Sequence, residues 1–314
     1  MKRTHALDAI RTTPWAIQPQ WLDAIEAIAE RALLASSVEQ LRQEEHGARY
    51  DAMLSAVADS GSRLPGSRNV TLSRGVALVP VMGPIMPYAN LMADLCGFTT
   101  LDSLSADLRS CEASPDVSQV LLVVDSPGGM TTQLSEVANQ IAALSKPVTS
   151  FVTGCAASAA YWLACQAGEI VMNDMAHVGS IGIVVTAAKQ VQPDSSGRMP
   201  VYIVSSNAPH KRYDLADEAD QARIRTMLDE MEAVFIAAVA SGRSTTVENV
   251  QQNFGQGGEM AARSAVAAGM ADRIDTLGNT IARLSTSPTS QQSAPRRNAA
   301  QQDLAQRRAR TKGN

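Results

Sequence analysis

The sequence predicts an α/β fold built around a largely parallel sheet. From Gly75 onward, short apolar runs of strand length alternate with segments of helical periodicity, and short turns join them. One run, residues 120–124, is apolar at every position, which is typical of a strand covered on both faces. Such a strand needs helices on both sides of the sheet, so the two observations support the same fold class.

The predicted elements follow one another along the chain. An amphipathic helix is expected over Pro14–Ala35, followed by a Gly- and Ser-containing linker over Ser55–Ser73. Strands are predicted over Val76–Val81, 120–124, Pro147–Val152, Ile170–Met172, Ile181–Val185 and Val201–Val204. Helices are predicted over Thr99–Glu112, with Asp102 and Asp107 on its solvent side, and over Gln133–Leu144, Ser158–Ala167, Asp217–Ala240, Val247–Phe254 and Glu259–Ala268. Gly269–Ile274 then provides a helix stop and a closing strand.

These elements divide the chain into three parts. Residues 1–73 form a predicted helical extension and linker, and residues 74–284 form the α/β domain. Residues 285–314 are rich in polar residues and carry six basic side chains against one acidic side chain, Asp303. A segment of this composition cannot bury a core, so we expect a disordered basic tail.

Composition excludes several classes of function. The 314-residue chain has a formal charge of −4, so nothing global indicates a nucleic-acid-binding protein. Its four cysteines are scattered without a C-x-x-C pair, which favours a reduced cytoplasmic protein without a metal site. No apolar run reaches the length of a membrane span, and no secretory signal is visible at the N-terminus.

Residues 125–129 (Asp-Ser-Pro-Gly-Gly) follow the buried strand directly. Glycine lets the backbone bend and approach a ligand closely, and amides beside a helix N-terminus suit a developing negative charge. The sequence therefore indicates either an oxyanion-binding turn or an ordinary strand-to-helix turn.

Ser158 also stands between a predicted strand and a predicted helix. A serine there is favoured either as a nucleophile, activated at the helix N-terminus, or simply as the helix N-cap. The neighbouring alanines leave room for another chain to approach, which favours the first interpretation.

Two later segments carry further candidates. Residues 179–182 read Gly-Ser-Ile-Gly, and Lys211 follows the predicted strand Val201–Val204. A lysine acts as a general base only where an apolar environment lowers its pKa. From the short loop after this strand Lys211 could turn inward, whereas a lone lysine is more commonly a solvated surface charge.

Taken together, these motifs resemble the signal-peptide-peptidase-A family, family 49 of the serine peptidases, in the Clp protease/crotonase superfamily. The nearest branch is that of bacteriophage head-maturation (prohead) proteases of the lambda capsid protein C type. The resemblance runs from about Pro14 to Asp275. Its anchors are Trp15, 83–85 (Gly-Pro-Ile), 125–129, 157–161 (Ala-Ser-Ala-Ala-Tyr), 179–182 and Lys211.

The resemblance implies a Clp/crotonase-like fold with repeated β-β-α units and a Ser-Lys dyad. It makes Ser158 the nucleophile, Lys211 the general base and Ser180 the residue that orients the lysine. Backbone amides of the oxyanion hole come from Gly128, Gly129 and Ala159. No metal or cofactor is implied. Lys189 is the alternative base, and a Ser-His-Asp triad using His177 or His210 is the competing mechanism, with Asp125 otherwise stabilising its turn.

The implied activity is that of a serine endopeptidase. The expected substrates are phage capsid-assembly proteins, namely scaffold, portal or the chain itself, cleaved in the host cytoplasm during prohead maturation. A homo-oligomer is expected, without nucleic acid or membrane as partner. Two alternatives remain: a bacterial peptidase that degrades signal peptides or other peptides, and an inactive crotonase-fold assembly module.

Overall fold

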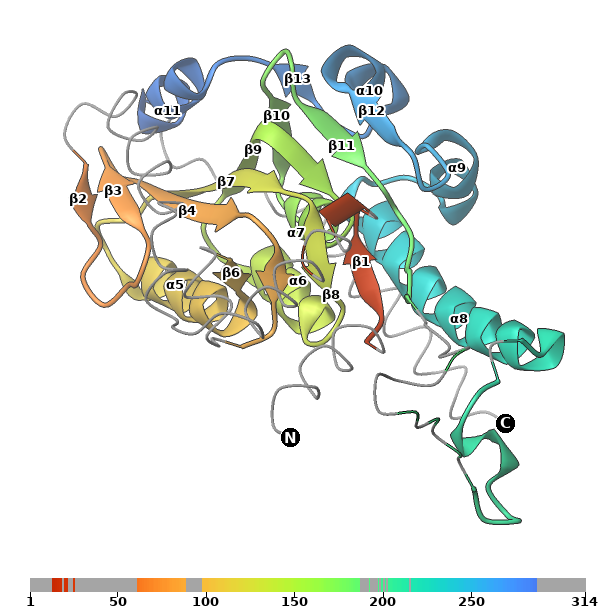
Figure 1. Ribbon diagram of the computed structural model, residues 1–314. Helices are drawn as coiled ribbons and strands as arrows, with labels where there is room; N and C mark the ends of the chain where they lie inside the picture. The colour runs from red at the N-terminus through yellow and green to blue at the C-terminus, as the bar shows by residue number, and fades with distance from the viewer. Residues whose placement is uncertain are drawn as a thin grey trace, which may run out of the picture.

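The computed structural model describes residues 13–18, 20–21, 25, 61–88, 98–186, 192, 197, 199, 201, 203–214 and 216–286. Within them the chain forms two sheets and a set of helices, drawn in Figure 1. The predicted tail beyond Thr286 and most of the predicted N-terminal helix lie outside the described residues.

The larger sheet has the strand order β12-β11-β9-β7-β4-β3-β2, and β10 pairs with both β9 and β13. The strands at its centre pair in parallel: β4, β7, β9, β10, β11 and β13. Antiparallel pairing adds β3 and β2 at one end and β12 at the other. This confirms the predicted α/β class. The strands are β2 (Ser62–Arg63), β3 (Thr71–Ser73), β4 (Val76–Met82), β7 (Gln119–Ser126), β9 (Val148–Ala157), β10 (Glu169–Met172), β11 (His177–Gly179), β12 (Glu259–Ala261) and β13 (Arg273–Ile274).

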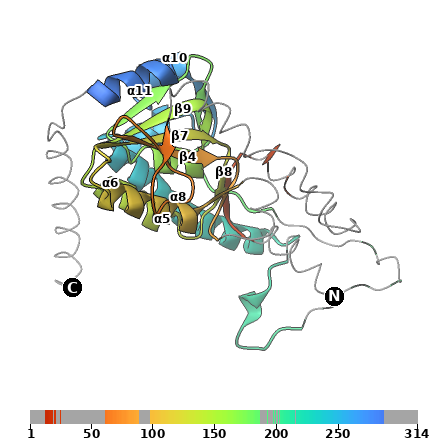
Figure 2. The same cartoon turned by 90° about the vertical axis from the view of Figure 1, so that its left-hand side faces the viewer.

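Helices cover both faces of this sheet (Figures 1 and 2). Alternate residues of the strands point to opposite faces, so Leu121 and Val123 contact one helix layer while Leu122 and Val124 contact the other. On one face lie α5 (Leu101–Ala113), α6 (Leu134–Ala143), α7 (Ala159–Ala164) and α8 (Glu218–Gly242); α11 (Leu277–Thr286) covers the other. The remaining helices are α9 (Val247–Asn253) and α10 (Ala262–Ala268).

The smaller sheet has the order β1-β8-β5-β6. Its strands are β1 (Trp15–Ile17), β5 (Ile85–Met86), β6 (Thr99–Thr100) and β8 (Gly128–Met130). The sequence predicted a helix from Pro14, so the assignment of Trp15–Ile17 to a helix is wrong. Pro19 explains the difference, because a proline inside a helix removes a backbone hydrogen bond and clashes with the carbonyl four residues earlier, here that of Trp15.

Other predictions need correction as well. Ser62–Arg63 and Thr71–Ser73, expected in a linker, form a hairpin that extends the main sheet. Ile181–Val185 forms no strand and makes one bridge, from Val184 to Trp15. Asp107 is buried rather than solvated, because its carboxylate accepts hydrogen bonds from the Arg68 and Asn69 amides.

The helix α11 was not predicted from the sequence. Three of its apolar side chains, Leu277, Ile281 and Leu284, are buried against the sheet. Their spacing of three and four residues is a helical signal, but the polar residues between them resemble the tail that follows.

Candidate active site

The carboxyl ends of three parallel strands meet at one edge of the main sheet. Gly179, the last residue of β11, is the register partner of Ala157, the last residue of β9. Ser126 at the end of β7 pairs with Ala156. Ligands bind outside the carboxyl ends of the strands in open parallel sheets. The structure therefore brings Ser158, Ser180 and the Gly128–Gly129 turn to one place.

Ser158 occupies a strained turn between β9 and α7. Its φ of 54° and ψ of −118° lie where residues other than glycine are rarely found. The backbone amide donates to the Gly179 carbonyl at 2.7 Å, which fixes the turn against β11. A serine on a sharp strand-to-helix turn is the arrangement that nucleophilic serines occupy in α/β-hydrolases.

The Ser158 hydroxyl is buried and unused by the fold. The residue is 1% exposed, and within the described residues its Oγ has no hydrogen-bond partner. It does not cap α7, since its side chain makes no cap hydrogen bond. An unpaired buried hydroxyl is costly, so its retention at this turn suggests a chemical rather than a structural role.

The glycine turn excludes side chains beside Ser158. A Cβ on Gly128, whose φ is 101°, would collide with the Ala16 carbonyl and would lie 3.0 Å from the Ala157 oxygen. A Cβ on Gly129 would collide with Ile85. The Gly128 amide donates to Ser126 Oγ at 3.2 Å, so it is already engaged in this conformation.

Ser180 begins the loop that follows β11. Its φ of 52° is again unusual for a non-glycine residue, and its amide donates to the Gly258 carbonyl at 2.8 Å. The residue is buried. Because the Gly179 carbonyl accepts the Ser158 amide hydrogen bond, the loop starts beside the Ser158 turn.

The structure does not bring Lys211 to this site. Lys211 ends the short 3-10 helix η2 (Pro209–Lys211), is exposed, and lies on a segment that projects away from the body in Figures 1 and 2. The predicted strand Val201–Val204 is absent among its described residues, and Val201 and Ile203 are 84% and 93% exposed. The apolar run that predicted a buried strand pairs with no strand among the residues that the structure describes. Lys189 lies outside the described residues.

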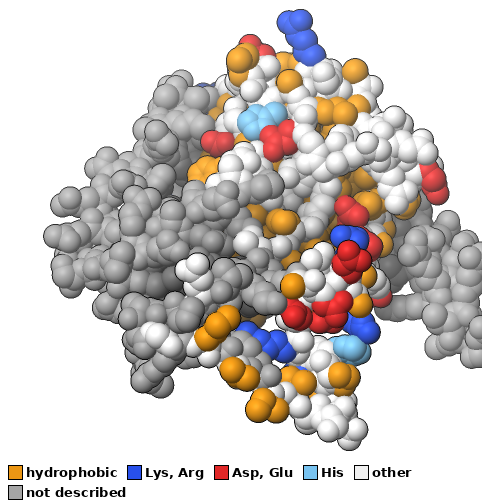
Figure 3. Space-filling view, turned by 45° about the vertical axis from the view of Figure 1, so that its right-hand side comes forward, with side chains coloured by type: hydrophobic (Ala, Val, Ile, Leu, Met, Phe, Trp, Pro, Cys, Tyr) orange, Lys and Arg blue, Asp and Glu red, His pale blue; other side chains and the backbone are white. Residues whose placement is uncertain are grey.

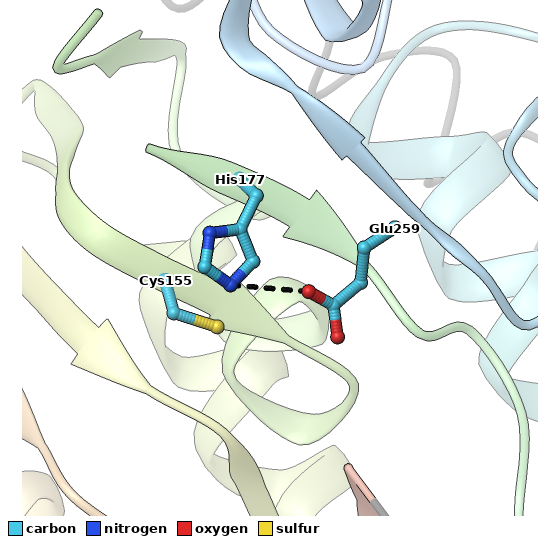
Figure 4. A group of neighbouring side chains, drawn as sticks. All are labelled: Cys155, His177 and Glu259. Carbon is cyan, nitrogen blue, oxygen red and sulfur yellow. Dashed lines mark ion pairs between the residues drawn. The ribbon is translucent and has the colours of Figure 1, made fainter. Parts of the chain in front are cut away.

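His177 lies on β11, beside Cys155 in the strand register (Figure 4). Its Nε2 pairs with a Glu259 carboxylate oxygen at 3.1 Å. Ligand atoms of Cys155, His177 and Glu259 all lie within 4.8 Å of one another, a set of donors that transition metals accept. The three residues are far apart in sequence and follow no motif spacing, so no sequence pattern indicates this cluster.

The Cys155 thiol is a poor nucleophile in this environment. Burial, with the nearby carboxylates of Glu259 and Asp125, raises the pKa of Cys155 to about 12. The thiol is therefore protonated near neutral pH, and the thiolate is the reactive form. Asp125 Oδ1 accepts a hydrogen bond from the Cys155 amide at 3.0 Å, in line with its expected role in stabilising the turn.

Among the described residues, no helix combines the length and apolar character needed to cross a bilayer. The long helix α8 buries a few apolar side chains near its C-terminal end and is otherwise largely exposed.

Comparison with known proteins confirms the family resemblance. Residues 140–288 match the model of peptidase family S49, a range that includes Ser158, Ser180 and Lys211. The chain is 25% identical over 293 residues to the head-tail preconnector protein GP5 of Enterobacteria phage P21, covering 90% of this chain and 57% of that protein. It is 23% identical over 222 residues to capsid assembly protease C of Escherichia phage lambda, covering 69% and 49%. It is 25% identical over 287 residues to protease 4 of Salmonella typhi, covering 87% and 43%. The chain thus spans about half the length of these curated relatives.

Proposed function

We propose that this chain is a serine endopeptidase of the Clp/crotonase-like fold with Ser158 as its nucleophile. The observation that carries the proposal is the buried, unpartnered Ser158 hydroxyl on a strained turn beside two glycines. The match to peptidase family S49 over residues 140–288 supports serine-type chemistry at this position.

The proposed reaction is acyl transfer through a covalent intermediate. Ser158 Oγ attacks the peptide carbonyl carbon while a neutral Lys211 amine accepts the hydroxyl proton. Backbone amides of Gly129 and Ala159, and of Gly128 if it leaves Ser126, hold the developing oxyanion. The lysine then passes its proton to the leaving amine, and water releases the acyl group with Lys211 again as base. Ser180 positions the lysine in this scheme, which uses no metal or cofactor.

Lys211 reaches Ser158 only if its segment moves or if a second copy of the chain supplies it. We favour the second copy, because Met199, Val201 and Ile203 are exposed on this segment. Figure 3 shows hydrophobic side chains gathered on the part of the molecule at the lower edge of the view. Apolar side chains on a projecting segment are typical of a surface that another subunit covers. This proposal is consistent with the homo-oligomer expected from the sequence.

A mixing experiment tests the source of the lysine. Ser158→Ala and Lys211→Ala chains are each inactive under the proposal, but their mixture, after dissociation and reassembly, should regain part of the wild-type peptidase activity. Lys146→Ala serves as the matched control, because the Lys146 amine is engaged by the Cys111 and Ser114 carbonyls and lies outside the site. Inactive mixtures of folded, assembled chains would place the base within one chain.

We propose capsid-assembly proteins as the substrates, within the host cytoplasm. Support comes from the relative in phage lambda, which is named a capsid assembly protease. Co-expression of this chain with phage scaffold and portal proteins should give cleaved products on electrophoresis. The Ser158→Ala chain should leave those proteins intact, and unchanged cleavage would refute the mechanism.

A bacterial role in peptide degradation is the second candidate, favoured by the similarity to protease 4 over 287 residues. It predicts that the chain fractionates with membranes and degrades signal peptides but not the scaffold.

A further inference from the structure

The strand β1 lies directly against the glycine strand of the site. Ala16 is the register partner of Gly129, and Ile17 is the partner of Gly128. The pairing continues at Gln18, whose amide donates to the Pro127 carbonyl at 2.9 Å. β1 therefore forms the outer neighbour of the turn proposed to bind the oxyanion (Figure 1).

The opposite edge of β1 is paired as well. Trp15 and Val184 exchange two backbone hydrogen bonds, each of 2.8 Å. Val184 belongs to the loop that follows Ser180. Three residues of the N-terminal segment thus fill the space between the glycine strand and the Ser180 loop, with backbone pairing on both sides.

This space borders the residue that precedes Ser158. The Ala16 carbonyl and the Ala157 carbonyl both approach Gly128 so closely that a Cβ there would meet each of them. Ala157 directly precedes Ser158, so β1 passes next to the nucleophile. A peptide that adds to a sheet edge is recognised mainly through its backbone, with pockets for alternate side chains.

One such pocket holds the Trp15 side chain. Trp15 is 0% exposed. Its cluster contains Ile17, Ile25, Met86, Phe98, Met130 and Val184. The next residue, Ala16, is also fully buried but packs with the main core. The occupant therefore has a large aromatic side chain followed by a small one.

The polar end of β1 is anchored next to the same site. Gln18 is 5% exposed, and its Nε2 donates to the Glu259 carboxylate. Glu259 in turn pairs with His177 at 3.1 Å. Trp15 and Gln18 therefore hold β1 at its two ends by different means.

We propose that β1 occupies the peptide-binding groove of this enzyme, and that a substrate segment must displace it. The groove takes an extended peptide with a large apolar side chain followed by a small residue, as in Trp15-Ala16. This inference rests on the proposed peptidase function, because it assigns the place of the peptide at Ser158. Under this proposal β1 competes with the substrate for the groove, and the apolar surroundings of Trp15 select a large side chain in the substrate.

The test measures binding without cleavage, in a Ser158→Ala background. A fluorescein-labelled synthetic peptide of residues 12–20 is titrated with the full-length chain and followed by fluorescence anisotropy. Trp15→Ala should loosen β1 and tighten peptide binding at least about tenfold relative to the Ser158→Ala chain alone. Trp21→Ala is the matched control, because Trp21 is 40% exposed and lies outside β1. The same peptide with alanine in place of its tryptophan should not bind.

A second variant covers the case in which Trp15→Ala does not fold. Gln18→Ala keeps the tryptophan and removes only the contact with Glu259, so it should raise peptide affinity while circular dichroism stays unchanged. Equal affinity of folded Ser158→Ala chains with and without these changes would overturn the proposal. Because no cleavage is measured, that result would leave the proposed peptidase activity standing, and loss of peptidase activity would leave the binding result standing.

Discussion

At the scale of single residues, the site combines features that the fold alone does not need. Ser158 has a strained backbone, and its buried hydroxyl has no hydrogen-bond partner among the described residues; each feature costs stability. The sequence placed Ser158 and the glycine turn directly after predicted strands, whereas Ser180 was expected just before a strand and was singled out only through the family resemblance. It did not predict the exposed position of Lys211, since an apolar run does not show whether its partner belongs to the same chain.

Replacing Ser158 with alanine should stabilise the protein while abolishing peptidase activity. The change removes a buried hydroxyl without a partner, for an expected gain of about 1 kcal/mol in the free energy of unfolding. Urea unfolding measures the gain. Ser150→Ala is the control, since its buried hydroxyl donates to the Ala164 carbonyl at 3.0 Å and its loss should destabilise. A lower midpoint for Ser158→Ala than for wild type would contradict the assignment.

Gly129→Ala should inactivate and destabilise the protein, by about 2 kcal/mol or more, because the new methyl group collides with the Ile85 backbone. The matched change Gly168→Ala should be tolerated, since its methyl group would lie 3.5 Å from the Val148 carbonyl, an ordinary contact. Peptidase assays and thermal unfolding compare the two variants. Equal behaviour would show that the close approach at Gly129 is unimportant.

At the scale of elements, local patterns predicted the central strands and most helices, and contacts between distant segments decided the rest. The run 120–124 is β7 in the structure because its apolar residues serve both helix layers. β1 was missed because its partners, Gly128–Met130 and Val184, are more than a hundred residues away. Periodicity within a window reports nothing about such pairing.

One ion pair joins three elements around the end of α8. Arg243 donates to both carboxylate oxygens of Asp272, at 2.8 and 3.0 Å, and to the Gly269 carbonyl at 3.1 Å, while Asp272 also accepts from the Ile170 amide. Arg243→Lys should therefore cost about 1–3 kcal/mol of unfolding free energy, because an ammonium cannot make the paired contacts. Arg263→Lys, at an exposed position, should change the urea midpoint little. Equal midpoints for both variants would contradict the role of the pair.

At the scale of the whole molecule, the fold places three ionisable thiols where they stay neutral. Burial raises the pKa of Cys111, Cys155 and Cys165 from the ordinary value of 9.0 to about 12. Below pH 9 the thiols are protonated in both the folded and the unfolded chain, so their full contribution to folding stability is present. Between pH 9 and 12 only the unfolded chain releases these protons, so folding stability falls.

Unfolding by urea at pH 7.5, 9.0 and 10.5 tests this expectation. The midpoint should fall above pH 9, and Cys155→Ala should make the fall shallower, because one of the three protons is no longer released on unfolding. A midpoint that does not change up to pH 10.5 would show that the thiols ionise equally in both states.

The central claim is that Ser158 forms the covalent intermediate, and intact-mass analysis with peptide mapping tests it most directly. After incubation with a peptidyl fluorophosphonate, the wild-type chain should carry one added group, on Ser158, and lose its peptidase activity in proportion. An active chain modified at another residue, or a Ser158→Ala chain that still cleaves peptides, would contradict the account.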